Sequence, residues 1–169
     1  MTLAVREKTD TAELERVVAS ELASLSVVGA ALSERSAGRV LLLGQGHRVF
    51  SGAERTPHHV SSDLPWHYAS HGSFVQAHLP QAARLYEHVL DRIERLGSGR
   101  PLSILELHAG SGTLSLALAA RGHRVTAVES YGPAVRLIED AAKAQNLAVR
   151  ALESDARAAL EESALVDVV

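Results

Sequence analysis

The segment Ile104–Thr113 (ILELHAGSGT) decides the fold that this sequence predicts. It begins as an apolar run that contains the acid Glu106, and it continues as a turn of small residues with Gly110 and Gly112. An apolar run at 114–120 follows, so the order is strand, tight turn and helix N-terminus. Proteins use this arrangement to hold a nucleotide-like ligand, because glycines admit it closely and backbone N–H groups face it. We therefore expect such a ligand at this turn.

Downstream of the turn, strand-like and helix-like segments alternate. The pattern predicts strands at 103–107, 124–128 and 147–152, helices at 113–120, 133–145 and 156–162, and the start of a fourth strand at 165–169. Such alternation forms a parallel, doubly wound sheet with helices on both faces. With about four parallel strands, this α/β sheet would be incomplete, and we expect the chain to be a fragment of a longer protein.

Upstream, residues 1–71 predict a small α+β region. Its expected elements are a helix at 9–32, a turn at 33–38, a strand at 39–43, a hairpin return at 47–50 and a short strand at 66–69. Residues 72–169 form the second predicted domain. It opens with a helix from Pro80 and a linker at 97–101.

Composition excludes several classes of protein. The net charge is −3, so charge alone indicates no nucleic-acid footprint, and there is no cysteine for a disulfide, a thiolate metal site or a nucleophile. No apolar run reaches about 18 residues, and the start lacks a secretory signal. We expect a cytoplasmic protein that does not bind membranes.

Histidines cluster between residues 58 and 78. His67 and His71 lie four apart, a spacing that could bind zinc on a helix, but Pro65 favours a strand there and no third ligand has suitable spacing. We therefore expect no metal site, and we interpret these histidines as surface or interface residues.

Acidic residues follow the next two predicted strands. Glu129 ends the second strand, where a carboxylate can accept hydrogen bonds from ribose hydroxyls, although strand ends often carry solvent-facing acids. Asp155 follows the third strand, where it could reach an adenine amino group or cap the helix at Ala156. Ser115 stands where a dinucleotide fold has its third glycine, which argues weakly against NAD.

Several motifs together resemble one family. The segment Ser73–His78 (SFVQAH), followed by Gln81-Ala82 and Leu85-Tyr86, resembles the s-F-x-Q-x-N…Q-A…L-Y signature of the RNA uracil-C5 methyltransferases, which modify tRNA or ribosomal RNA. Residues 105–113 resemble that family's L-D-L-Y-C-G-x-G-T/N, within the E/D-x-x-x-G-x-G pattern of class I S-adenosylmethionine-dependent methyltransferases. The resemblance covers 72–169 well and 9–71 loosely.

The resemblance implies a Rossmann-like class I methyltransferase fold, S-adenosylmethionine as cofactor and RNA as partner of the full-length protein. It implies that the cofactor is bound by residues of the turn and of the strand ends, namely Gln76, His108, Gly110, Gly112, Thr113, Glu129 and Asp155. His78 and Ala109 replace the family's asparagine and frequent cysteine. The family's cysteine nucleophile and general-base glutamate would lie beyond Val169. The chain alone is therefore expected to be inactive and to hold no catalytic residue.

Two other interpretations stay open at this point. One is a fragment of an NAD(P)-dependent oxidoreductase, which would need Ser115 to substitute for glycine. The other is a non-catalytic nucleotide-binding module, complete at 169 residues. The oligomeric state, the RNA target and the methyl acceptor do not follow from the sequence.

Overall fold

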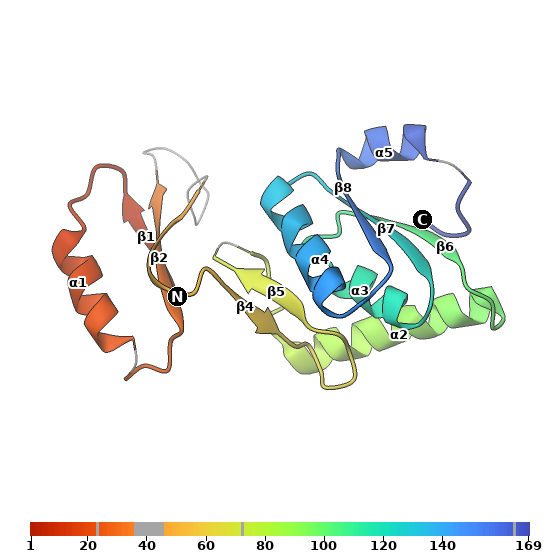
Figure 1. The fold of residues 1–169 in the computed structure, drawn as a ribbon, viewed down its shortest axis with the longest axis horizontal. Coiled ribbons are helices and arrows are strands. Elements are labelled where there is room, and N and C mark those ends of the chain that lie inside the picture. The colour runs from red at the N-terminus through yellow and green to blue at the C-terminus, as the bar shows by residue number, and fades with distance from the viewer. Residues whose placement is uncertain (23, 36–45, 72, 164) are drawn as a thin grey trace. The chain divides into compact units, whose positions relative to one another are not determined.

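The structure is a computed structural model that describes residues 1–22, 24–35, 46–71, 73–163 and 165–169 (Figure 1). The chain divides into two compact units, and each is described by itself. The first comprises Met1–Thr56 and Ser70–Gly72, and the second comprises Pro57–Ala69 and Ser73–Val169. Packing thus groups residues 57–69 with the second unit, whereas the sequence interpretation placed them in the first region.

The second unit is built on a parallel sheet. Its strands β6 (Ser103–Leu107), β7 (Arg124–Glu129) and β8 (Val149–Glu153) lie in the order β6-β7-β8. The predicted fourth strand is present as one parallel bridge from Val168 to Ile104, on the side of β6 away from β7. The predicted parallel sheet is therefore confirmed, with β8 beginning two residues later than expected.

Helices cover both faces of this sheet, as predicted (Figure 1). They are α2 (Leu79–Gly97), α3 (Thr113–Ala120), α4 (Gly132–Ala144) and α5 (Ala156–Glu162). On one face, Ile104 packs with α2 and α3, and Ala127 packs with Ile138 of α4. On the other face, Leu105 and Val128 pack with α5. Alternate residues of each strand thus enter opposite halves of the core.

A short hairpin packs on helices of the second unit. Its strands are β4 (Arg55–His58) and β5 (His67–Ser70), close to the predicted strand at 66–69. Trp66 and Tyr68 pack against buried residues of α3 and α4. The Gln145 side chain, at the end of α4, donates to the Trp66 carbonyl (2.8 Å) and accepts from the Trp66 N–H (3.2 Å). Apolar packing and two hydrogen bonds therefore attach the start of β5 to these helices.

The first unit contains β1 (Thr2–Arg6), α1 (Ala12–Glu21), β2 (Gly29–Arg35) and β3 (Arg48–Gly52). β2 is the central strand, parallel to β1 and antiparallel to β3. The predicted helix at 9–32 is confirmed over α1 but wrong at 29–32, and the predicted turn is wrong at 33–35, because residues 29–35 form β2. The extended segment predicted at 47–50 is present from Arg48 as β3, which pairs with β2. Its predicted hairpin partner, the strand at 39–43, lies outside the described residues.

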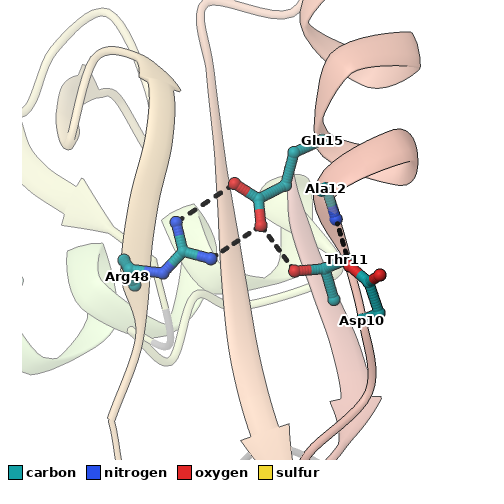
Figure 2. Close-up of polar contacts among 5 residues, drawn as sticks. All are labelled: Asp10, Thr11, Ala12, Glu15 and Arg48. Atoms are coloured by element: carbon teal, nitrogen blue, oxygen red, sulfur yellow. Dashed lines mark hydrogen bonds and ion pairs between the residues drawn. The ribbon is translucent and has the colours of Figure 1, made fainter.

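An ion pair joins α1 to β3 within this unit (Figure 2). The Arg48 guanidinium donates to both carboxylate oxygens of Glu15, at 2.7 and 3.1 Å, and the Thr11 hydroxyl donates to the same carboxylate. Asp10, which precedes the N-cap Thr11, accepts from the Ala12 N–H at 3.1 Å and so satisfies the first free N–H of α1. The hydrogen bonds from Arg48 and then Thr11 lower the pKa of Glu15 to about 2.

None of the helices in the described part of the chain has both the length and the apolar character that a membrane crossing requires.

Candidate functional site

The ends of β6, β7 and β8 meet at one edge of the parallel sheet. The register aligns Leu107 with Val128 and Glu129 with Glu153, so the three following loops leave the sheet side by side. Ligands of open α/β sheets bind in the crevice beyond these strand ends. The structure thus brings the glycine turn, Glu129 and the loop before Asp155 to the same edge, as the sequence predicted.

Every second residue of the turn after β6 has a left-handed backbone conformation. His108, Gly110 and Gly112 have φ values of 58°, 59° and 82°. A Cβ on Gly112 would lie 2.8 Å from Cγ1 of Ile138, so α4 packs directly on this glycine, whereas a Cβ on Gly110 would meet nothing within 4 Å. Glycine is therefore favoured by conformation at both positions, and at Gly112 it is also required by packing. The His108 side chain is exposed.

Glu129 holds the glycine turn directly. Its carboxylate accepts from the Gly110 N–H (2.9 Å), the Tyr131 N–H (2.9 Å) and the Ser130 hydroxyl (3.3 Å). Partial burial opposes ionisation, but the hydrogen bonds from Tyr131, Gly110 and Ser130 outweigh it and lower the pKa of Glu129. The Gly110 N–H donates to Oε2, whereas the Tyr131 N–H and the Ser130 hydroxyl donate to Oε1. An ionised acceptor therefore stands beside the turn.

Glu106 orders the helix that follows the turn. Gly112 is the N-cap of α3 and has no side chain to cap it. The Glu106 carboxyl group instead accepts from both the backbone N–H and the hydroxyl of Ser115, a fully buried residue in the first helical turn. Burial raises the pKa of Glu106 to about 7. Ser115 at the third glycine position is thus the hydrogen-bonding partner of Glu106.

Thr113, the first residue of α3, contacts a histidine that sequence reasoning did not assign to the site. The Thr113 hydroxyl lies 3.2 Å from Nδ1 of His67 in β5, and it also hydrogen-bonds Tyr86 of α2. His67 is only 2% exposed, so the interpretation of this residue as a surface histidine is wrong. Burial, with His58 and His59 nearby, lowers the pKa of His67 to about 4. Only its strand position after Pro65 hinted at an inward-facing side chain.

The remaining predicted site residues take other places. Asp155 caps α5, because its Oδ1 accepts from the N–H groups of Arg157 (2.9 Å) and Ala158 (3.4 Å). Gln76 is half-buried in the segment before α2, and no hydrogen bond among the described residues joins its side chain to the glycine turn. His78 caps α2 by accepting from the Gln81 N–H at 3.2 Å. Within the described ranges, no group of three or more histidine or acidic side chains could hold a metal ion.

Comparisons with known proteins place these features in context. The chain is 34% identical over 84 residues to an uncharacterized RNA methyltransferase of Protochlamydia amoebophila, an alignment that covers 49% of this chain and 19% of that protein. No protein-family model matches the chain. The chain therefore spans about a fifth of the curated relative that it matches.

Two solved structures share the architecture. The tRNA (uracil-54, C5)-methyltransferase of Pyrococcus abyssi, in complex with S-adenosyl-L-homocysteine, matches 89% of this chain with a TM-score of 0.66 and 19% identity. The match covers 34% of that enzyme. A SAM-dependent methyltransferase of Agrobacterium tumefaciens matches 83% of this chain and 44% of its own, with a TM-score of 0.53 and 19% identity. Together with the parallel sheet, these likenesses show a Rossmann-like α/β fold, which the chain shares with these two methyltransferases.

Proposed function

We propose that this chain is the S-adenosylmethionine-binding part of an RNA methyltransferase, and that the whole protein methylates C5 of uracil in tRNA or ribosomal RNA. The observation that carries the proposal is the hydrogen bond between the Glu129 carboxylate and the Gly110 N–H at the ends of the parallel strands. It fixes an ionised acceptor against a turn that a ligand can approach closely. A ligand with a ribose and a flexible polar end matches that arrangement.

The proposed roles follow from the chemistry of each residue. Glu129 would accept hydrogen bonds from the ribose hydroxyls, and Gly110 and Gly112 would let the backbone approach the amino-acid end of the ligand. Asp155 would contact the adenine amino group. By the family resemblance, Gln76, His108 and Thr113 would complete the pocket. The cofactor supplies an electrophilic methyl group on a sulfonium.

The uracil acceptor is supported by the motif series rather than by the site. The segment Ser73–His78 resembles the signature of uracil-C5 methyltransferases, and the Pyrococcus abyssi enzyme with the same architecture modifies that base position. The curated relative is named an RNA methyltransferase. We propose that the nucleophile comes from a part of the full-length protein outside these residues, because this chain has no cysteine.

Calorimetric titration of the chain with S-adenosylhomocysteine tests the cofactor proposal. We expect saturable binding that falls at least about tenfold in Glu129→Gln, because the amide cannot accept on both sides at once. Glu139→Gln removes the same charge from an exposed position on α4 and should leave the affinity unchanged. NADH should not compete. A folded wild-type chain that binds neither S-adenosylhomocysteine nor S-adenosylmethionine would overturn the proposal.

The acceptor proposal needs the full-length protein. RNA labelled with tritium at uracil C5 must release the label to water when that carbon is methylated, because the C5 proton is replaced. We expect the full-length protein with S-adenosylmethionine to release tritium and the chain alone to release none. Methyl incorporation without tritium release would exclude C5 of uracil as the methyl acceptor. Only the proposal that the full-length protein is a methyltransferase would then remain.

A further inference from the structure

A buried histidine of the β4–β5 hairpin reaches the first residue of α3. The Nδ1 atom of His67 lies 3.2 Å from the hydroxyl oxygen of Thr113, which directly follows Gly112 of the glycine turn. The two residues are separated by 46 positions, so their contact is made by the fold and not by local sequence. Both belong to the second compact unit.

The Thr113 hydroxyl is held by more than one partner. Tyr86 of α2 also hydrogen-bonds it, so side chains from β5, α2 and α3 converge on one oxygen. A hydroxyl offers one donor and two acceptor positions. His67 and Tyr86 therefore both restrain the orientation of the Thr113 side chain. The first turn of α3 is thereby tied to two neighbouring elements.

His67 is itself held in place. Its ring packs at 5.0 Å between centroids against His58 of the opposite strand. The adjacent Trp66 is anchored to Gln145 by hydrogen bonds of 2.8 and 3.2 Å. Burial lowers the pKa of His67 to about 4, so the ring is neutral at pH 7 and places no cation beside the site. A neutral ring is compatible with a sulfonium ligand, whereas a charged one would repel it.

We infer that His67 is a positioning residue for S-adenosylmethionine: through the Thr113 hydroxyl it fixes the first turn of α3 and the adjoining glycine turn in the form that the ligand binds. The inference rests on the proposed function, and it assigns to the β4–β5 hairpin a role that the motif series from residue 73 onward does not contain. His67 touches no ligand in this scheme, because its effect passes through Thr113.

A mutant cycle on the 169-residue chain tests this inference. His67→Leu should weaken S-adenosylhomocysteine binding about fivefold, the equivalent of one buried hydrogen bond. His67→Asn places an amide near the position of Nδ1 and should restore most of that loss. Because His67 acts through Thr113, the double variant His67→Leu/Thr113→Val should bind no more weakly than Thr113→Val alone. His88→Leu, at an exposed position of α2, is the matched control and should bind as wild type.

A measurement without ligand distinguishes a positioning role of His67 from a general effect on the stability of the fold. In ¹⁵N spectra of the histidine rings, Thr113→Val should shift the His67 Nδ1 resonance and leave that of His88 in place. Circular dichroism checks that each variant is folded, and His67→Asn keeps the test open if His67→Leu is not.

The outcomes distinguish the two proposals. If wild type binds S-adenosylhomocysteine and His67→Leu binds within twofold of it, this inference fails and the proposed function stands. Additive losses in the double variant would equally overturn it, since His67 would then act independently of Thr113. If the folded wild type binds no such ligand, the proposed function fails and the ligand role of His67 fails with it.

Discussion

The Glu106 carboxyl group, at the end of β6, accepts hydrogen bonds from both the backbone N–H and the hydroxyl of Ser115 in the first turn of α3. The cap of the helix therefore comes from the preceding strand, across the glycine turn. The N-terminal turn of α3 thus has an acceptor for one of its unpaired N–H groups although its N-cap, Gly112, has no side chain. It also places an acid where burial raises its pKa to about 7.

This raised pKa predicts a pH-dependent stability. Between an unfolded-state pKa of 4.5 and a folded-state pKa of about 7, the folded chain binds a proton at Glu106 that the unfolded chain does not. Its contribution to stability therefore increases as pH falls from 7 toward 4.5 and is least favourable above 7. Glu106→Gln is neutral at every pH and should be more stable than wild type at pH 8, by about 1–3 kcal/mol. That difference should shrink toward pH 5.

Urea unfolding of both proteins at intervals from pH 5 to pH 8 measures this difference. Glu139→Gln, from an exposed position on α4, provides the control and should follow the wild-type curve at a constant offset. A difference between Glu106→Gln and wild type that does not change with pH would contradict the prediction.

The two glycines of the turn should differ in their tolerance of alanine. Both have positive φ, but a Cβ on Gly112 would lie 2.8 Å from Ile138, and a Cβ on Gly110 would meet nothing within 4 Å. Gly110→Ala should cost only the conformational strain, about 1 kcal/mol. Gly112→Ala adds overpacking against α4 and should cost about 2–4 kcal/mol in the free energy of unfolding. Equal losses of unfolding free energy in the two variants would contradict the prediction, because they would show that α4 shifts to accommodate the added methyl group.

In the first unit, the pair of Glu15 and Arg48 predicts a sensitivity to acid. The hydrogen bonds from Arg48 and Thr11 lower the pKa of Glu15 to about 2, from an ordinary value of 4.5. The stabilisation is therefore complete above pH 4.5 and is lost as pH falls toward 2. In an NMR titration, Arg48→Gln should move the pKa of Glu15 up toward 4.5. Arg16→Gln, which removes an exposed charge from the same helix, should leave it unchanged.

The sequence predicted the glycine turn and its flanking strands well, because their chemistry is local. The apolar run predicts β6, and Gly110 and Gly112 predict the left-handed turn and the helix start that follow within a few residues. Glu129 could be assigned to the same edge because parallel strands end together. These features need no knowledge of distant contacts.

The sequence predicted a helix where the first residues of β2 lie, and the reason is physical. Residues Ala30, Ala31 and Leu32 of β2, the central strand, are at most 2% exposed, so its side chains are buried on both faces of the sheet. A strand buried on both faces reads as a continuous apolar run, which periodicity cannot distinguish from a helix. His67 was missed for a different reason: its partner Thr113 lies 46 residues away, and no local pattern records that contact.

Asp155 carries two predicted roles that a set of substitutions can separate. The structure shows it as the N-cap of α5, with both hydrogen bonds to Oδ1, and contact with an adenine amino group remains a proposal. Serine and asparagine cap helices about as well as aspartate. Serine is too short to reach the ligand, and the single oxygen of asparagine cannot cap α5 and also accept from an adenine amino group. Asp155→Ser should thus keep the free energy of unfolding within about 0.5 kcal/mol of wild type, and Asp155→Ala should lose about 1 kcal/mol.

The affinities of these variants for S-adenosylhomocysteine should follow a different order from their stabilities. If the side chain accepts from the adenine amino group, Asp155→Ser, Asp155→Asn and Asp155→Ala should each lose about fivefold in calorimetric affinity. Should Asp155→Ser bind as wild type does, the residue serves α5 alone, and adenine recognition belongs to another part of the strand-end edge. Since stability and affinity rank the serine variant in opposite ways, loss of the cap cannot imitate loss of the ligand contact.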